Sequence, residues 1–241
     1  MSTAIIITGE MRSFERCIKN LEWQVFRHFP DAKFYVAPAD DEDASKAELL
    51  REKHEHVWIK PVTQPEMVMP PGCPTTWTPG QFYMHEPYHI SVPPTAVIGQ
   101  LWSLREGWHL YESANDPADV IIRCRPDLWF HNFVMPGGLY TEGTALVAYT
   151  PWWGRFGGIN DRFAIMGKYA ASNYFNTYTK LPYLIEYGCP LHPESLVKAS
   201  LEAGGNYVSA DLLAEFSTLR KNGEMRMPEI TAIDRHHHLR S

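Results

Sequence analysis

The sequence lacks the features of a disulfide-stapled or membrane-spanning protein. Its 241 residues include only four cysteines, Cys17, Cys73, Cys124 and Cys189, and no two of them form a C-x-x-C pair. Isolated cysteines are typical of free thiols in a reducing compartment rather than of disulfides or a zinc site. No apolar run approaches the roughly 20 residues that span a bilayer, and no basic leader precedes an apolar segment. We therefore expect a cytoplasmic protein without a transmembrane segment.

Positive charge is also scarce. Lysine and arginine total 22 against 28 aspartates and glutamates, which gives a formal net charge of −6. Nucleic-acid binders carry a basic footprint, so this balance argues against nucleic acid as a partner, although it leaves room for a small pocket that binds one phosphate group. No G-x-x-x-x-G-K-[ST] segment is present, which argues against a P-loop kinase or sulfotransferase.

Apolar runs and amphipathic segments alternate from the N-terminus onward. Helices are expected at 14–29, with Ser13 as its cap, and at 45–54, 95–114, 168–178 and 192–203. Strands are expected at 4–8, 33–36, 56–60, 118–123 and 144–149, within 159–166, and around 230–233. This alternation predicts an α/β fold in which helices flank a mostly parallel sheet, and the length suits a single domain over 1–241.

One long segment, 61–94, interrupts this pattern. It contains nine prolines and shows little periodicity. A loop of this length inside a compact domain is either functional or disordered. Its aromatic residues favour a packed loop that faces a substrate; they are Trp77, Phe82, Tyr83 and Tyr88.

Charged residues follow the first predicted strand. The segment GEMR places Gly9 at a sharp turn and Arg12 near the start of a helix. An arginine beside a helix N-terminus makes an anion site. A surface arginine without a ligand is the alternative.

A second charged segment, RCRPD at 123–127, ends the most apolar strand. Alternation along the strand predicts Arg123 and Arg125 on one face, with Cys124 on the other. Pro126 ends the strand and presents Asp127 just beyond it. Two guanidinium groups and a carboxylate suit a ligand with phosphate and either a divalent cation or sugar hydroxyls. The alternative is an internal Arg–Asp salt bridge.

Five segments in this order resemble nucleotide-sugar-dependent glycosyltransferases of the GT-A type, in particular small bacterial and viral enzymes of glycan-building gene sets. They are GEMRSF, GQLWSLREGWHLYES, ADVIIRCRPDLWF, GGINDRFAIMGKYAASNYF and HPESLVKASL, and they span roughly 4–205. The resemblance implies a GT-A-like fold. It also implies transfer of a sugar from a nucleotide diphosphate sugar to a glycan or other hydroxyl acceptor. The alternative is a non-catalytic nucleotide- or glycan-binding protein with a degenerate metal motif.

The resemblance implies roles for individual residues on the donor side. Asp127 would meet the metal and diphosphate of the donor. Arg123 and Arg125 would hold the sugar or diphosphate, and Arg12 would lie near the nucleotide. Asp161, in GGIND, would lie beside the acceptor as the candidate general base. An inverting transfer needs such a base and a retaining transfer does not, so the stereochemical outcome stays open.

The expected cofactor is a divalent cation, Mn²⁺ or Mg²⁺, but the motif departs from the family pattern. Arg125 stands where an Asp-x-Asp pair has its first aspartate, so Asp127 is alone. A single carboxylate holds such a cation weakly, although donor phosphates and waters can complete its shell. Either the donor binds most of the metal or the arginines replace it. His236 and His238 are candidate further ligands, with an exposed polar tail as the alternative.

Five more residues are candidates for the acceptor and sugar side. Trp152 and Trp153 would stack on a sugar ring, or equally pack in the core. Asn160 precedes the candidate base. His192 and Glu194 open a helix, where an acid complements the helix dipole, and where Glu194 would otherwise contact sugar hydroxyls.

Overall fold

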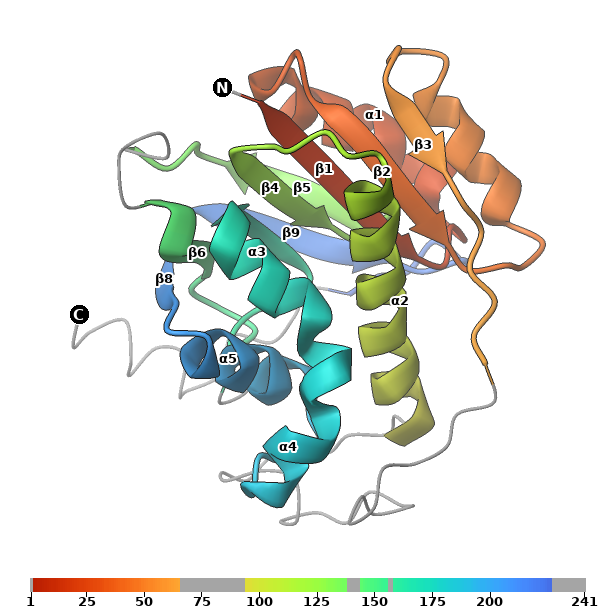
Figure 1. Ribbon diagram of the computed structural model, residues 1–241. Helices are drawn as coiled ribbons and strands as arrows, with labels where there is room; N and C mark the ends of the chain where they lie inside the picture. Colours follow the sequence, from red (N-terminus) through yellow and green to blue (C-terminus); the bar gives the residue numbers. More distant parts are fainter. Residues whose placement is uncertain (1, 66–93, 138–143, 156–157, 227–241) are drawn as a thin grey trace.

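The computed structural model describes residues 2–65, 94–137, 144–155 and 158–226, and in these ranges the chain forms a seven-stranded sheet of order β3-β2-β1-β4-β7-β6-β8 (Figure 1). β7 runs antiparallel to β4 and β6, and the other neighbours are parallel. The predicted α/β class with a mostly parallel sheet is therefore confirmed. The strands are β1 (Thr3–Gly9), β2 (Lys33–Pro38), β3 (Val57–Ile59), β4 (Val120–Cys124), β6 (Val147–Pro151), β7 (Phe163–Gly167) and β8 (Tyr207–Leu212).

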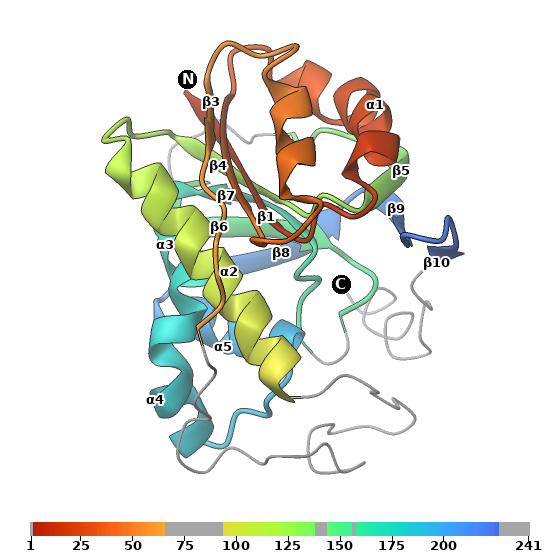
Figure 2. The same ribbon diagram turned by 90° about the vertical axis from the view of Figure 1, so that its right-hand side faces the viewer.

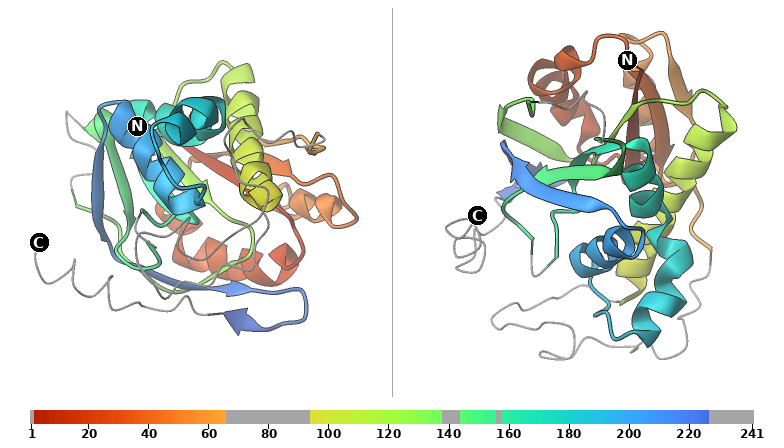
Figure 3. Two further views of the ribbon diagram at one scale, coloured as in Figure 1. Left: turned by 90° about the horizontal axis from the view of Figure 1, so that it is seen from below. Right: turned by 60° about the vertical axis from the view of Figure 1, so that its left-hand side comes forward.

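Helices cover both faces of this sheet (Figures 2 and 3). In β1 the side chains alternate: Ile5 and Ile7 pack with the residues of α1, whereas Ala4 and Ile6 pack with those of α2, α3 and α5. Burial on both faces explains why β1 is continuously apolar. The helices are α1 (Phe14–Gln24), α2 (Pro94–Ser113), α3 (Lys168–Phe175), α4 (Leu181–Glu186) and α5 (Pro193–Ala203). No helix in the described ranges is long and apolar enough to cross a membrane.

A second, antiparallel sheet lies on the α1 side, which the sequence patterns did not predict. Its order is β10-β9-β5, with β5 at Leu128–Phe133, β9 at Ala214–Leu219 and β10 at Met225–Arg226. β5 follows directly on the RCRPD segment. Its pairing with β9 brings the end of β9 beside that segment, because the Leu219 amide donates to the Asp127 carbonyl at 2.8 Å.

Several expected boundaries were wrong. The first helix ends at Gln24 and is followed by a 3₁₀ turn, and the segment expected at 45–54 is a 3₁₀ helix, Ala44–Leu50. Ser13 occupies the N-cap position as predicted, but its side chain makes no capping hydrogen bond; its hydroxyl donates instead to the Leu219 carbonyl at 2.5 Å. The strand expected within 159–166 begins only at Phe163. The strand expected around 230–233, and most of the loop at 61–94, lie outside the described residues.

Gly107 lets α2 approach β1 closely. A Cβ atom at this position would lie 2.5 Å from Cγ2 of Thr8 and 2.9 Å from Cγ2 of Ile6. We expect Gly107→Ala to lower the free energy of unfolding by about 2 kcal/mol, because overpacking outweighs the gain in helix propensity. Urea denaturation measures the effect. Glu112→Ala, at an exposed position of α2, is the control and should change stability by less than about 0.5 kcal/mol. An unchanged midpoint for Gly107→Ala would show that the helix is not held this close to the sheet.

Candidate functional site

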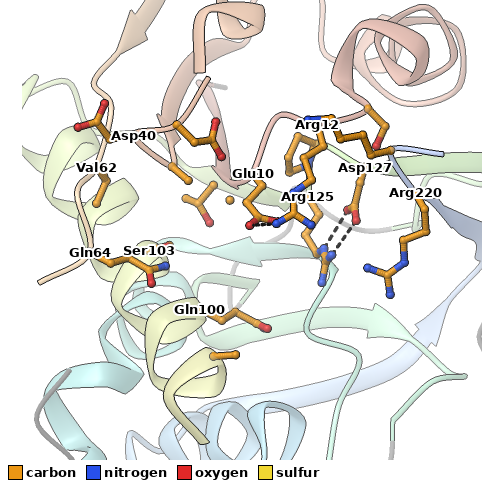
Figure 4. A pocket seen from close by; sticks show the side chains of 18 of the residues that line it. Glu10, Arg12, Asp40, Val62, Gln64, Gln100, Ser103, Arg125, Asp127 and Arg220 are labelled. Atoms are coloured by element: carbon orange, nitrogen blue, oxygen red, sulfur yellow. Dashed lines mark hydrogen bonds and ion pairs between the residues drawn. The ribbon is translucent and has the colours of Figure 1, made fainter. Parts of the chain in front are cut away.

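A cavity of about 600 Å³ opens at the carboxyl ends of β1, β2 and β4 (Figure 4). This is the edge at which open α/β sheets bind ligands. Gly9 ends β1 with φ of +117°, a conformation that favours glycine, so the predicted sharp turn is present. Arg12, Arg123, Arg125 and Asp127, which the sequence assigned to the donor side, all line the cavity.

One side of the cavity is rich in guanidinium groups. Figure 4 shows Arg12, Arg125 and Arg220 gathered around Asp127. Arg12, beside the start of α1, pairs with Glu10, and both side chains are about half exposed. Arg220 directly follows β9, is exposed, and makes no ion pair with a described residue. Sequence reasoning missed Arg220, since only the pairing of β9 with β5 brings it to this edge.

Arg125 and Asp127 form a two-point ion pair. Arg125 Nε donates to Asp127 Oδ1 at 2.9 Å, and Nη2 donates to Oδ2 at 2.7 Å. Burial alone would lower the pKa of Arg125, but the Asp127 carboxylate raises it above its ordinary value. Burial alone would likewise raise the pKa of Asp127, and Arg125 lowers it. The salt bridge that the sequence left open as an alternative is therefore present at the end of the strand.

Arg123 is the second-last residue of β4, and its side chain is buried at the carboxyl end of the sheet. Its side chain is only 2% exposed, and Nη1 donates to the Cys124 carbonyl at 2.7 Å and to the Thr8 carbonyl at 3.3 Å. Within the described residues its Nε has no hydrogen-bond partner. Because these two acceptors are neutral carbonyls, Arg123 brings a positive charge to the cavity that no carboxylate of the described ranges pairs with directly.

The opposite side of the cavity carries carboxylates, amides and hydroxyls. Asp40 and Asp41 follow β2, and Thr63 and Gln64 lie beyond β3. The Thr63 hydroxyl donates to Asp40 at 2.9 Å, and the Gln64 amide donates to the Gly99 carbonyl of α2 at 3.4 Å. Sequence reasoning also missed these residues. The signal for the aspartates was the acidic run that begins at residue 40, directly after a predicted strand.

Asp161 lies beneath the cavity and not on its wall. Its side chain is 3% exposed, and its carboxylate accepts a hydrogen bond from Gln100, which does line the cavity. The Tyr174 hydroxyl donates to the Asp161 carbonyl at 2.7 Å and so fixes this part of the chain. Burial, and then the negative charge of Glu194, raise the pKa of Asp161 above its ordinary value.

Glu194 and His192 lie in contact at the start of α5, and the charge of Glu194 acts on Asp161. Glu194 is 4% exposed; its Oε2 lies 3.0 Å from His192 Nε2, and its Oε1 lies 3.7 Å from Arg162 Nη2. Burial alone would raise the pKa of Glu194, but His192 and then Arg162 lower it. Neither His192 nor Glu194 lines the cavity. Both residues thus lie away from the described cavity wall, with Glu194 close enough to the candidate base to act on its charge.

The remaining acceptor-side candidates build the loop before β7. Trp153 is 4% exposed, its indole N–H donates to the Ala214 carbonyl at 2.8 Å, and its ring packs edge-on against Phe216. The Asn160 amide donates to the Trp153 carbonyl at 3.0 Å. Trp153 is therefore a core residue, as the alternative interpretation had it, and Trp152 is half-buried against the same core.

The residues around Asp127 do not fit the expected divalent cation. Both Asp127 oxygens already accept hydrogen bonds from Arg125. Across the described ranges, no group of three or more histidine, cysteine, aspartate or glutamate side chains is arranged to hold a metal ion. His236 and His238, the other predicted ligands, lie outside the described residues.

No family model matches the chain, and no curated protein matches it. Solved structures of three proteins are among those that resemble it, all at low identity. An active-site mutant of LgtC is 10% identical over 87% of this chain and 72% of that chain, with a TM-score of 0.43; a second LgtC structure describes that protein as a galactosyltransferase. A nucleoside-diphosphate-sugar pyrophosphorylase from Vibrio cholerae RC9 is 12% identical over 99% and 100%, with a TM-score of 0.47. Mouse xyloside xylosyltransferase 1 is 10% identical over 84% and 82%, with a TM-score of 0.37. These matches describe overall shape alone.

Proposed function

We propose that the chain is a glycosyltransferase that moves a sugar from a nucleotide diphosphate sugar to a glycan or other hydroxyl acceptor. The observation that carries the proposal is the division of one cavity into a guanidinium side and a carboxylate–amide side. A nucleotide sugar likewise combines a charged diphosphate with groups rich in hydroxyls, the nucleoside on one side of it and the sugar on the other. The volume of about 600 Å³ also lies within the usual range for small-molecule sites.

The guanidinium side suits the diphosphate. Arg125 uses two of its five N–H groups on Asp127, which leaves three for a ligand. Arg12 and Arg220 add two more planar donors at the same edge. Guanidinium groups bind phosphate oxygens through paired, charge-assisted hydrogen bonds.

The opposite side suits hydroxyl groups. Asp40 and Asp41 are acceptors for ribose or sugar hydroxyls, and the exposed Gln64 amide carries both a donor and an acceptor. Neutral hydroxyls do not repel these carboxylates as a phosphate would. The charge division therefore favours the diphosphate on the guanidinium side and one of the two hydroxyl-bearing groups on the opposite side.

Asp161 remains the candidate general base of an inverting transfer. A carboxylate with a raised pKa is better suited to take a proton near neutral pH. Gln100 lies between Asp161 and the cavity, so the base role requires Gln100 to move aside or an acceptor to reach past it. In this structure, the hydrogen bond to Asp161 holds the Gln100 amide at the cavity.

The proposal is tested by thermal unfolding with adenosine, guanosine, uridine and cytidine diphosphates and their sugar derivatives. A ligand that binds only the folded state at a hundredfold excess over Kd stabilises by about 2.7 kcal/mol, which corresponds to roughly 5–10 °C in Tm for a chain of this size. We expect one base to give such a shift, and its nucleotide sugar to be hydrolysed. Arg12→Ala should reduce the shift, and Arg51→Ala should not. Arg51 is a matched control because it is equally exposed and also pairs with a nearby glutamate, away from the cavity.

A shift without hydrolysis or transfer to any acceptor would favour the alternative, a nucleotide- or glycan-binding protein that is not an enzyme. The pairing of Asp127 with Arg125, in place of a metal motif, is the observation that keeps this alternative in view. No shift with any nucleotide would contradict the proposed function and the nucleotide-binding alternative, and would leave only a glycan-binding protein.

A further inference from the structure

We propose that guanidinium groups of this chain, and no divalent cation, neutralise the diphosphate of the donor. The inference rests on the proposed function and names how the same site handles the leaving group. The sequence left two alternatives open: a metal bound mainly through the donor, with Asp127 as its single carboxylate, or replacement of the metal by arginines. Three features of the structure favour the arginines.

The first feature is the state of Asp127. Its two oxygens are taken by Arg125 at 2.9 and 2.7 Å, and the two side chains are only 27% and 15% exposed. One lone pair of each oxygen is then left. A cation bound there would lie beside the Arg125 guanidinium, a group of like charge that is held at hydrogen-bond distance from the same oxygens. Asp127 is therefore a positioning residue, which holds Arg125 at the cavity.

The second feature is the pair of cationic groups that make no ion pair with any residue that the structure describes. Arg123 is bound to main-chain carbonyls, and Arg220 is exposed at the end of β9. Both line the cavity. On the guanidinium side they supply two positive charges that are not engaged in the ion pairs with Glu10 and Asp127, and a diphosphate diester carries two negative charges.

The third feature is the main chain that holds these groups together. The Leu219 amide donates to the Asp127 carbonyl, and the Leu219 carbonyl accepts the Ser13 hydroxyl. Leu219, the last residue of β9, is thus bonded to Asp127, in the segment after β4, and to Ser13, at the start of α1. Arg12 is adjacent to Ser13, Arg220 is adjacent to Leu219, and Arg125 is two residues from Asp127. These hydrogen bonds therefore hold the three arginines at the same end of the sheet before any ligand binds.

The step that these charges assist is the departure of the nucleoside diphosphate. The bond between the anomeric carbon and the terminal phosphate oxygen breaks, and its electron pair stays on that oxygen. The acceptor oxygen forms the new bond to the anomeric carbon, and its proton passes to a base. The diphosphate gains one negative charge in this step, so preorganised cations stabilise the transition state more than the bound donor.

The inference is tested by isothermal titration with the nucleoside diphosphate that gives the thermal shift, once in EDTA and once in Mn²⁺. We expect the two Kd values to agree within about threefold, and Arg220→Ala to weaken binding about tenfold in both buffers, with partial recovery in Arg220→Lys. Binding that requires Mn²⁺ would overturn the inference and leave the proposed function standing. No binding of any nucleotide in either buffer would contradict the proposed function itself.

Asp127→Asn separates the two roles of Asp127 without depending on turnover. If Asp127 only positions Arg125, the variant weakens nucleotide binding by the same factor in EDTA and in Mn²⁺. If Asp127 is a metal ligand, the variant leaves binding in EDTA unchanged and raises the Mn²⁺ concentration needed for half-maximal binding. A folded variant is verified by its circular dichroism, and the Arg51→Ala protein serves again as the control.

Discussion

Arg125→Ala is expected to abolish detectable nucleotide binding and to lower the free energy of unfolding by about 2 kcal/mol. The binding loss follows because Arg125 presents its remaining N–H groups to the cavity. The stability loss follows because Asp127 keeps its charge at a site that is only 15% exposed. Removing one partner of a fully buried pair costs about 3–5 kcal/mol, and partial exposure of this pair reduces the cost. Urea denaturation and titration calorimetry measure the two effects.

The double variant Arg125→Met, Asp127→Leu separates these effects. Hydrophobic side chains of similar volume often replace a shielded ion pair at little or no cost in stability. We therefore expect the double variant to regain most of the lost stability and none of the lost binding. Recovery of binding along with stability would mean that Arg125 acts only by holding the fold together, and its place in the proposed function would be lost.

Glu194→Ala is expected to lower the free energy of unfolding by about 3 kcal/mol at neutral pH. The carboxylate is 4% exposed, and its removal takes an anion away from both His192 and Arg162. Glu194→Gln keeps the shape and an acceptor oxygen, so it should cost less. Thermal unfolding distinguishes them, with roughly 6–12 °C expected for the alanine variant. A loss below about 1 kcal/mol would contradict a role for Glu194 as the anion that holds this cluster.

The two buried carboxylates, Glu194 and Asp161, also make the free energy of unfolding depend on pH, in opposite directions. The pKa of Glu194 is lowered, so its contribution is present above the ordinary glutamate pKa of about 4.3 and is lost as pH falls through its folded value. The pKa of Asp161 is raised, so its contribution is present below the ordinary aspartate pKa of about 3.9 and is lost as pH rises through its folded value. Glu194→Gln should therefore weaken the loss of stability in acid, and Asp161→Asn should weaken the loss as pH rises.

The same pair of variants tests Asp161 as the base. Glu194 contributes to the raised pKa of Asp161, so Glu194→Gln should move the acid limb of the pH profile for sugar transfer to lower pH. Asp161→Asn should retain nucleotide binding and lose transfer. An acid limb that does not move in Glu194→Gln, in a variant that still transfers sugar, would assign the proton to another group.

Local sequence patterns were sufficient to predict the strands and helices whose own residues show a clear hydrophobic run or spacing. The β-branched run of β1 and the spacing of apolar residues in α2 depend on neighbours within one or two turns, so their places could be predicted from the sequence. The end of the sheet at which the candidate site lies was also predictable. Parallel strands have their carboxyl ends on one side of a sheet, and charged residues directly follow β1 and β4. The acidic residues after β2 carried the same signal.

The partners of the charged groups were decided only by the tertiary structure. Arg12, Arg125 and Asp127 were predicted at the cavity, but an arginine and an aspartate two residues apart are equally compatible with a ligand site and with a salt bridge. The packing of β5 against β9 brought Arg220 beside them and completed the guanidinium side of the cavity. Likewise α5 holds Glu194 close enough to Asp161 to raise its pKa, and Trp153 packs in the core and not at the site. Hydrophobic periodicity fixes which residues are buried and in which element, whereas the charge state and partners of a side chain depend on segments far away in the chain that only folding brings together.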